Sequence, residues 1–170
     1  MKRLEITLIL IALLLGMFSC KPSKEEAIKY NDLIINQQIS INRKIETLNK
    51  SFKNWEKSDS MDICRLNALE QVEQSIKLVS EMKDFHGNSN LRDEAISLFK
   101  IYKNIIGNEF KEMIMIYKLP LELYTKDQER KWNNLSDSAF SKMDIAISKM
   151  QEEQKKFAEE FKFEFEKEKK

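Results

Sequence analysis

Histidine and cysteine, the side chains that most often act as nucleophiles, bases and metal ligands, are rare in this chain. The chain of 170 residues has one histidine, His86, and two cysteines, Cys20 and Cys64. A carboxylate-bridged di-iron site needs a Glu-x-x-His motif from each of two helices, which a single histidine does not supply. The Cys-x-x-Cys-His motif for covalent haem attachment is absent. The sequence therefore predicts no catalytic residues, no metal site, no cofactor and no enzyme.

One alternative is an enzyme that uses the Cys64 thiol, which would need a base or a positive charge beside it. Cys64 and His86 lie near opposite ends of one expected helix, roughly 33 Å apart at about 1.5 Å per residue. We therefore expect His86 to be a loop residue. For Cys64 two interpretations stay open, a small core side chain or a thiol that pairs between molecules.

Cys20 stands at the end of a different pattern. Lys2 and Arg3 precede the apolar run 6–18, and Ser19 and Cys20 follow it. A basic start, a short apolar segment and a small residue predict a cleaved signal peptide. A cysteine directly after the small residue resembles the lipobox of bacterial lipoproteins. The resemblance implies removal of residues 1–19, with diacylglycerol on the Cys20 sulfur and an acyl chain on its nitrogen.

The alternative for this segment is an uncleaved membrane anchor. The apolar run of 13 residues would reach roughly 20 Å as a helix. A helix that crosses the hydrocarbon core needs about 20 residues, so the segment is too short to span it comfortably. We therefore expect residues 1–19 to be a signal peptide, residues 20–23 a lipidated tether, and residues 24–170 one helical domain.

Charge and composition argue against a nucleic-acid-binding protein and in favour of a helical one. Removal of residues 1–19 takes two basic residues and one acidic residue from totals of 29 and 28, which leaves 27 of each. A balanced charge argues against a nucleic-acid binder, which carries a basic patch. Three glycines and two prolines among 170 residues, with 34% charged residues, indicate long helices.

Apolar residues at steps of three, four and seven predict four amphipathic helices. The first runs from a capping box at Ser23 and Glu26 to about Lys57, and Ser58–Ser60 is expected to cap the second. The second ends at Asp84–Gly87, where Gly87 can adopt a left-handed conformation. The third runs from Asn88–Asn90 to Pro120, and the fourth from a second capping box at Thr125 and Gln128 to about Phe161.

Short connections make successive helices antiparallel. The sequence thus predicts an all-α fold, an antiparallel up-down-up-down four-helix bundle after the cleaved signal peptide. A longer three-helix coil is the alternative. The expected core residues are Ala27, Ile34, Ile41, Ile45, Leu48, Phe52 and Trp55 in helix one, Leu69, Val72, Ile76, Val79 and Met82 in helix two, Leu91, Ala95, Leu98, Tyr102, Ile106, Phe110, Met113 and Tyr117 in helix three, and Trp132, Leu135, Ala139, Met143, Ala146, Met150, Phe157 and Phe161 in helix four.

Several segments resemble an uncharacterised family of helical bacterial surface lipoproteins. They are Ala27–Asp32, Phe85–Asn88, Leu91–Ala95 and Leu98–Lys103. The resemblance implies a helical bundle on a bacterial surface and brings no catalytic residues with it.

Leu121, Leu123 and Tyr124 follow Pro120 in the connection expected to lie far from the lipid. Loops on a rigid scaffold often carry function, and tyrosine is enriched at binding hot spots. We therefore expect these three residues to bind a partner. The alternative is that they fold over the bundle end and seal Trp55 and Trp132 from water.

The sequence as a whole predicts a lipid-anchored, non-catalytic binding or structural module of the bacterial cell envelope. Lys21 after Cys20 departs from the aspartate that retains lipoproteins at the inner membrane of enteric bacteria, so the outer membrane or cell surface is favoured. The expected partners are the membrane, through the lipid on Cys20, and an envelope or extracellular protein, but no nucleic acid. A bundle that carries a small ligand or haem between its helices is the main alternative.

Overall fold

The computed structural model describes residues 22–54 and 56–164. These residues form α2 (Lys24–Lys53), α3 (Ser58–Ser80), α4 (Asn90–Gly107), α5 (Glu109–Tyr117), the short 3₁₀ helix η1 (Leu121–Leu123) and α6 (Lys126–Glu160). The described part contains no β-strand, only an isolated bridge between Phe85 and Asn88. The predicted all-α class is therefore confirmed.

Of the three predicted side-chain caps, the one at Ser23 is confirmed in full and the one at Thr125 in part. Ser23 and Glu26 form the full capping box, because the Glu26 amide donates to Ser23 Oγ at 3.1 Å and the Ser23 amide donates to Glu26 Oε2 at 2.8 Å. At α6 the Gln128 amide donates to Thr125 Oγ1 at 3.5 Å, which caps the helix without the reciprocal bond of a capping box. The predicted cap of helix two is wrong, since Ser58 is already helical and Lys57 is the N-cap, without a side-chain cap.

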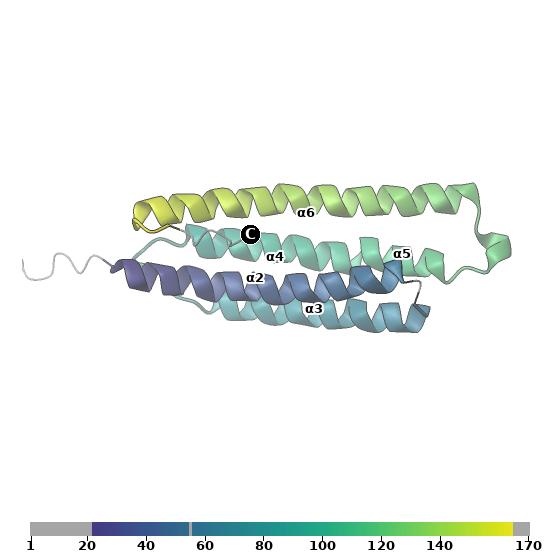
Figure 1. Cartoon of the computed structure of the whole chain (residues 1–170), viewed down its shortest axis with the longest axis horizontal. Helices are drawn as coiled ribbons and strands as arrows, with labels where there is room; N and C mark the ends of the chain where they lie inside the picture. The colour runs from purple at the N-terminus through teal and green to yellow at the C-terminus, as the bar shows by residue number, and fades with distance from the viewer. Residues whose placement is uncertain (1–21, 55, 165–170) are drawn as a thin grey trace, which may run out of the picture.

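The helices lie side by side along one long axis (Figure 1). α2 packs on α3, α3 packs on α4, and both α4 and α5 pack on α6. α2 and α6 meet through aromatic side chains. Near one end Tyr30 lies 5.8 Å from Phe157, and near the other Phe52 lies 5.6 Å from Trp132, both measured between ring centroids.

The end at which α2 begins also holds the α3–α4 connection and the end of α6 (Figure 1). We call it the aromatic end, after its cluster of rings in tilted and edge-to-face contact, Tyr30, Phe85, Phe157, Phe161 and Phe163. The opposite end holds the α2–α3 and α5–α6 connections. We call residues 117–125 at this end the tip.

Most of the predicted core residues are buried. In α2, Ala27, Ile34, Ile41, Ile45 and Leu48 are all buried, as predicted. The prediction for α3 is half wrong, because Val72 and Val79 are buried but Leu69 and Ile76 are only partly covered. The stripe of α3 passes instead through two polar residues, Arg65 and Ser75, which a hydropathy pattern does not reveal.

These two polar residues have partners across or along the helices. Arg65 Nε donates to Asp62 Oδ1 at 2.7 Å, and Ser75 Oγ donates to Gln37 Oε1 of α2 at 3.0 Å. Because burial of an unpaired polar group is costly, the bond from Ser75 to Gln37 favours one register of α3 against α2. Tyr102 of α4, 1% exposed, makes a similar contact with Gln38.

The predicted third helix is broken in two. α4 ends at Gly107 and α5 begins at Glu109, with Asn108 between them at φ −116° and ψ −72°. Glycine and asparagine are both poor helix formers, so their adjacent positions weaken the helix here. The break also lies where the buried Glu109 carboxylate contacts Lys142 of α6 and accepts a hydrogen bond from Ser138 at 3.4 Å.

The α3–α4 connection differs from its prediction as well. α3 ends at Ser80, several residues before Gly87. Phe85 and Asn88 exchange backbone hydrogen bonds of 2.9 Å, and His86 and Gly87 between them have φ values of 50° and 84°. Two successive positive φ values are typical of a tight I′ turn. Gly87 thus adopts the left-handed conformation that was predicted, but it serves this turn and does not stop a helix.

Candidate partner-binding surface at the tip

The tip is a short hydrogen-bonded segment between two helices. α5 ends at Tyr117, Pro120 precedes η1, and Thr125 caps α6. The Leu123 amide donates to the Pro120 carbonyl at 2.9 Å, and the Tyr124 amide donates to the Leu121 carbonyl at 3.2 Å. Proline at the start of the turn fixes its own φ near −65°. The tip therefore has a defined backbone in spite of its lack of long helix.

All three residues predicted to bind a partner are exposed in this segment. Leu121 is 85% exposed, Leu123 57% and Tyr124 43%. In Figure 1 the segment lies beyond the ends of α2 and α3, so those helices do not cover it. Single exposed apolar residues are ordinary. Three of them within four positions form a local apolar surface, and such surfaces are a feature of binding sites.

Two of these residues also line a pocket. Leu121 and Tyr124 surround a space of about 320 Å³ together with Tyr117, Leu119 and Trp132. Leu123 does not take part in its lining. Ligand sites are typically concave, of about 300–1,000 Å³, and lined by apolar and aromatic groups with a few polar atoms. Here the tyrosine hydroxyls and the indole N–H are the polar atoms.

Trp132 connects this pocket to the core. Its ring meets Phe52 edge-on at 5.6 Å, and Phe52 lies 6.0 Å from Phe110 of α5. Trp132 is partly buried and packs against the hydrophobic core. Trp132, predicted as a core residue, thus packs against the core and lines the pocket as well. Trp55, also predicted as a core residue, lies outside the described residues.

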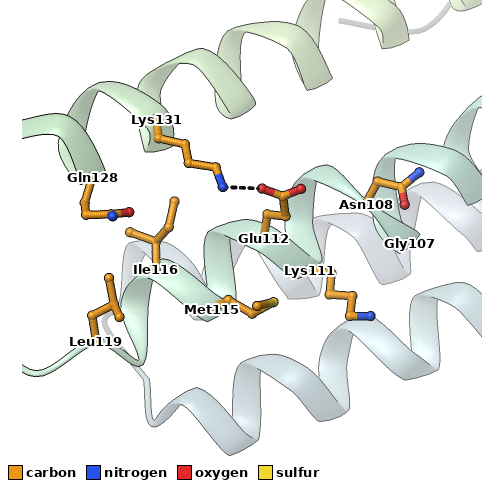
Figure 2. Close-up of a pocket in the computed structure, with 9 residues that line it drawn as sticks. All are labelled: Gly107, Asn108, Lys111, Glu112, Met115, Ile116, Leu119, Gln128 and Lys131. Atoms are coloured by element: carbon orange, nitrogen blue, oxygen red, sulfur yellow. Dashed lines mark ion pairs between the residues drawn. The ribbon is translucent and has the colours of Figure 1, made fainter.

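A second hollow adjoins the pocket along α5 (Figure 2). It measures about 510 Å³ and is lined by Gly107, Asn108, Lys111, Glu112, Met115, Ile116 and Leu119, and by Gln128 and Lys131 of α6. Leu119 lines both spaces. We call this second hollow the groove. Lys111 and Met115 lie one turn apart on α5, and Leu119 lies two residues after α5 ends. All three line the groove, and we call them the ridge.

The charges of the groove are not balanced. Lys131 Nζ lies 2.7 Å from Glu112 Oε2, and this pair joins α6 to α5 across the groove. Figure 2 shows Lys111 extending away from this pair. Within the described part of the chain Lys111 forms no ion pair. The groove thus combines an apolar residue, Met115 at 59% exposure, with one uncompensated positive charge.

Other groups that could do chemistry lie apart from the tip. His86 is exposed in the α3–α4 turn, as predicted, and contacts the Phe85 ring. Cys64 is partly covered near the start of α3 and has no disulfide among the described residues. The same residues contain no cluster of three or more His, Cys, Asp or Glu side chains suited to hold a metal ion. Cys20, the predicted lipidation site, lies outside them.

Sequence reasoning missed Tyr117 and Leu119 as pocket residues and the whole groove. Tyr117 was assigned to the core, and it is only partly buried. The i+4 spacing of Lys111, Met115 and Leu119 was the available signal, since on a helix it would place a charge and two apolar groups on one face. Because the core stripe of α5 passes through neighbouring positions, that ridge was hidden among apolar residues.

The chain was compared with known proteins. It matches no protein-family model, no curated protein and no solved structure. Among the described helices, none is both long enough and apolar enough to cross a membrane.

Proposed function

We propose that this protein is a bacterial lipoprotein, anchored through acyl chains on Cys20, that acts as a non-catalytic binding module of the cell envelope. The observation that carries the proposal is the exposure of Leu121, Leu123 and Tyr124 at the end of the rod opposite the start of α2. The outer membrane or cell surface is the favoured location, and the expected partner is another envelope or extracellular protein.

The proposed fold of the module is the antiparallel up-down-up-down bundle, with α4 and α5 together as its third helix. What supports this arrangement is the set of neighbours at the aromatic end. Tyr30, near the start of α2, contacts Phe85 after α3 and Phe157 near the end of α6 at 5.0 and 5.8 Å. Short connections between successive helices favour the same topology.

The length of α2 gives the distance between the membrane anchor and the tip. α2 begins at Lys24 behind a complete capping box, so only a few residues separate it from Cys20. Its 30 residues extend about 45 Å at the helical rise. If α2 stands along the membrane normal, a protein anchored at Cys20 would hold its tip more than about 45 Å from the bilayer surface, because the tip lies beyond the end of α2 (Figure 1). Two or three acyl chains would keep it there durably, since each buried methylene contributes about 0.8 kcal/mol.

Anchoring is tested at Cys20. We expect the native protein to begin at an acylated Cys20, and Cys20→Ser to accumulate as an unacylated precursor that retains residues 1–19. Mass spectrometry of the N-terminal peptide distinguishes the two. A native N-terminus that bears no lipid, or a retained residue 1–19 segment, would exclude the anchor.

Partner binding is tested at the tip. We expect Leu121→Ser with Leu123→Ser to lose the envelope proteins that cross-link to the native chain, while its melting temperature stays the same. The matched control is Leu33→Ser with Leu78→Ser, because both leucines are more than half exposed but lie away from the tip. Equal cross-linking by both double variants and the native chain would discard the tip as a recognition surface.

A further inference from the structure

The pocket and the groove adjoin each other, because Leu119 lines both. Leu119 stands between them, with the aromatic pocket on one side and the ridge of Met115 and Lys111 on the other. Lys111 lies about 9 Å from the end of α5 at Tyr117 at the helical rise, and Leu119, two residues farther on, extends the span to roughly 12 Å. The pocket and the groove together therefore offer an apolar cavity at one end and a positive charge at the other.

The size of the tip argues against a second copy of the chain as its occupant. Each helix is about 10–12 Å wide with its side chains, so a bundle two helices across has an end of roughly 400–600 Å². A stable protein–protein interface buries about 800 Å² on each partner. End-to-end contact of two rods therefore falls short of what a dimer needs, and a segment that lies along the groove and enters the pocket fits the site better.

We propose that the pocket and the groove together bind an extended peptide segment of a partner protein, with a bulky apolar residue in the pocket and a carboxylate on Lys111. The charge of the groove selects the carboxylate, because Lys131 is already paired with Glu112 at 2.7 Å while Lys111 is not paired. An extended chain rises about 3.3 Å per residue. A span of about 12 Å then sets the acidic residue three or four positions from the apolar one.

This inference rests on the proposed function and adds the chemistry of the partner to it. The pocket of about 320 Å³ is about twice the size of an apolar cavity of about 150 Å³ that holds benzene, so it has room for one large side chain. Met115, 59% exposed, would lie under the peptide between its two anchors. Methionine suits this position because its flexible thioether adapts to varied neighbours.

The test is selection from a phage-displayed library of random twelve-residue peptides on the purified full-length protein. We expect selected peptides to carry Trp, Phe, Leu or Met with Asp or Glu three or four positions away. Peptides selected on Lys111→Glu should carry Lys or Arg in place of the acidic residue. The affinity of this variant for a synthetic acidic peptide should be about fivefold lower, near 1 kcal/mol. Lys100→Glu is the matched control, since Lys100 is exposed on α4 outside the groove, and it should leave the preference unchanged.

The outcomes separate this inference from the function on which it rests. If Lys111→Glu selects the same peptides as the native chain, the groove is not the site, even where the tip double variant still loses its envelope partners. Selection of peptides without the spacing would overturn the inference as well. So would a dimer in sedimentation that Leu121→Ser dissociates, or a small apolar molecule that is extracted from the native protein and absent from that variant.

Discussion

Large apolar side chains are buried at the aromatic end of the helical bundle and exposed at the tip. At the aromatic end Phe85, Phe157 and Phe163 are 8%, 2% and 7% exposed, and Phe157 lies 4.7 Å from Phe161. At the tip, Leu121 and Leu123 are 85% and 57% exposed. Both ends have large apolar side chains beside a change of chain direction. What differs is the number of elements that converge, since the tip extends beyond α2 and α3 (Figure 1).

The connections are also held differently. At the aromatic end, Arg92 donates to the Met82 carbonyl at 3.0 Å and pairs with Asp84, and the Asn88 side chain donates to Glu160 at 2.8 Å. Side chains from three segments therefore fix that turn. At the tip the backbone bonds of residues 120–124 define η1. The contacts at the aromatic end thus stabilise the fold, whereas the tip leaves its apolar groups accessible.

The strongest test of this comparison removes a ring from the aromatic end. Phe157 contacts Tyr30, Phe85, Phe161 and Phe163. We expect Phe157→Ala to lower the free energy of unfolding by about 3–5 kcal/mol, because it removes buried apolar area and leaves a cavity. Urea denaturation measures this. Phe140→Ala on the same helix is the control, since Phe140 is 52% exposed, and it should change stability by less than about 0.5 kcal/mol.

Tyr102, a buried residue of α4 that belongs to neither end, tests whether the helices between the two ends are closely packed. Burial raises the pKa of the Tyr102 phenol to about 12. The unfolded chain, with an ordinary pKa near 10, then releases its proton first. The contribution of Tyr102 to stability is thus complete below pH 10 and is lost as the pH rises through about 12. Two pKa units correspond to about 2.7 kcal/mol.

We therefore expect alkaline unfolding of the native protein to be steeper between pH 10 and 12 than that of Tyr102→Phe. Lysines titrate in the same pH range. Their contribution cancels when the pH profile of Tyr102→Phe is subtracted from that of the native protein. Urea midpoints at pH 9, 10, 11 and 12 measure it. Parallel pH profiles would mean that Tyr102 reaches solvent and that the middle of the rod is open.

The sequence was most informative where helices have strong apolar stripes. In α2 the predicted aliphatic residues are buried, but Phe52 is only partly buried and the buried Asn31 and Ser51 were missed. α3 was predicted less well, since its stripe includes Arg65 and Ser75, whose burial depends on partners elsewhere in the chain or on another helix. The break at Asn108 was missed because Gly107 and Asn108 do not interrupt the apolar periodicity on either side.

For the candidate site, the sequence identified the exposed residues but not the cavity. Leu121, Leu123 and Tyr124 could be predicted because proline and the connection made burial difficult. The pocket depends on how Tyr117 and Leu119 meet Trp132 from another helix, and no local pattern contains that information. The groove likewise requires α5 and α6 side by side.

The smallest expected effect belongs to the tip, and it decides whether the two ends truly differ. We expect Leu123→Ser with Tyr124→Ser to change the free energy of unfolding by less than about 1 kcal/mol, because exposed side chains contribute little to stability. Emission from Trp132, measured in a Trp55→Phe background, should keep its wavelength because Phe52 still covers the ring at 5.6 Å. A larger loss of stability with a red shift would mean that the tip seals the core as the aromatic end does. Recognition would then have to occur elsewhere on the rod.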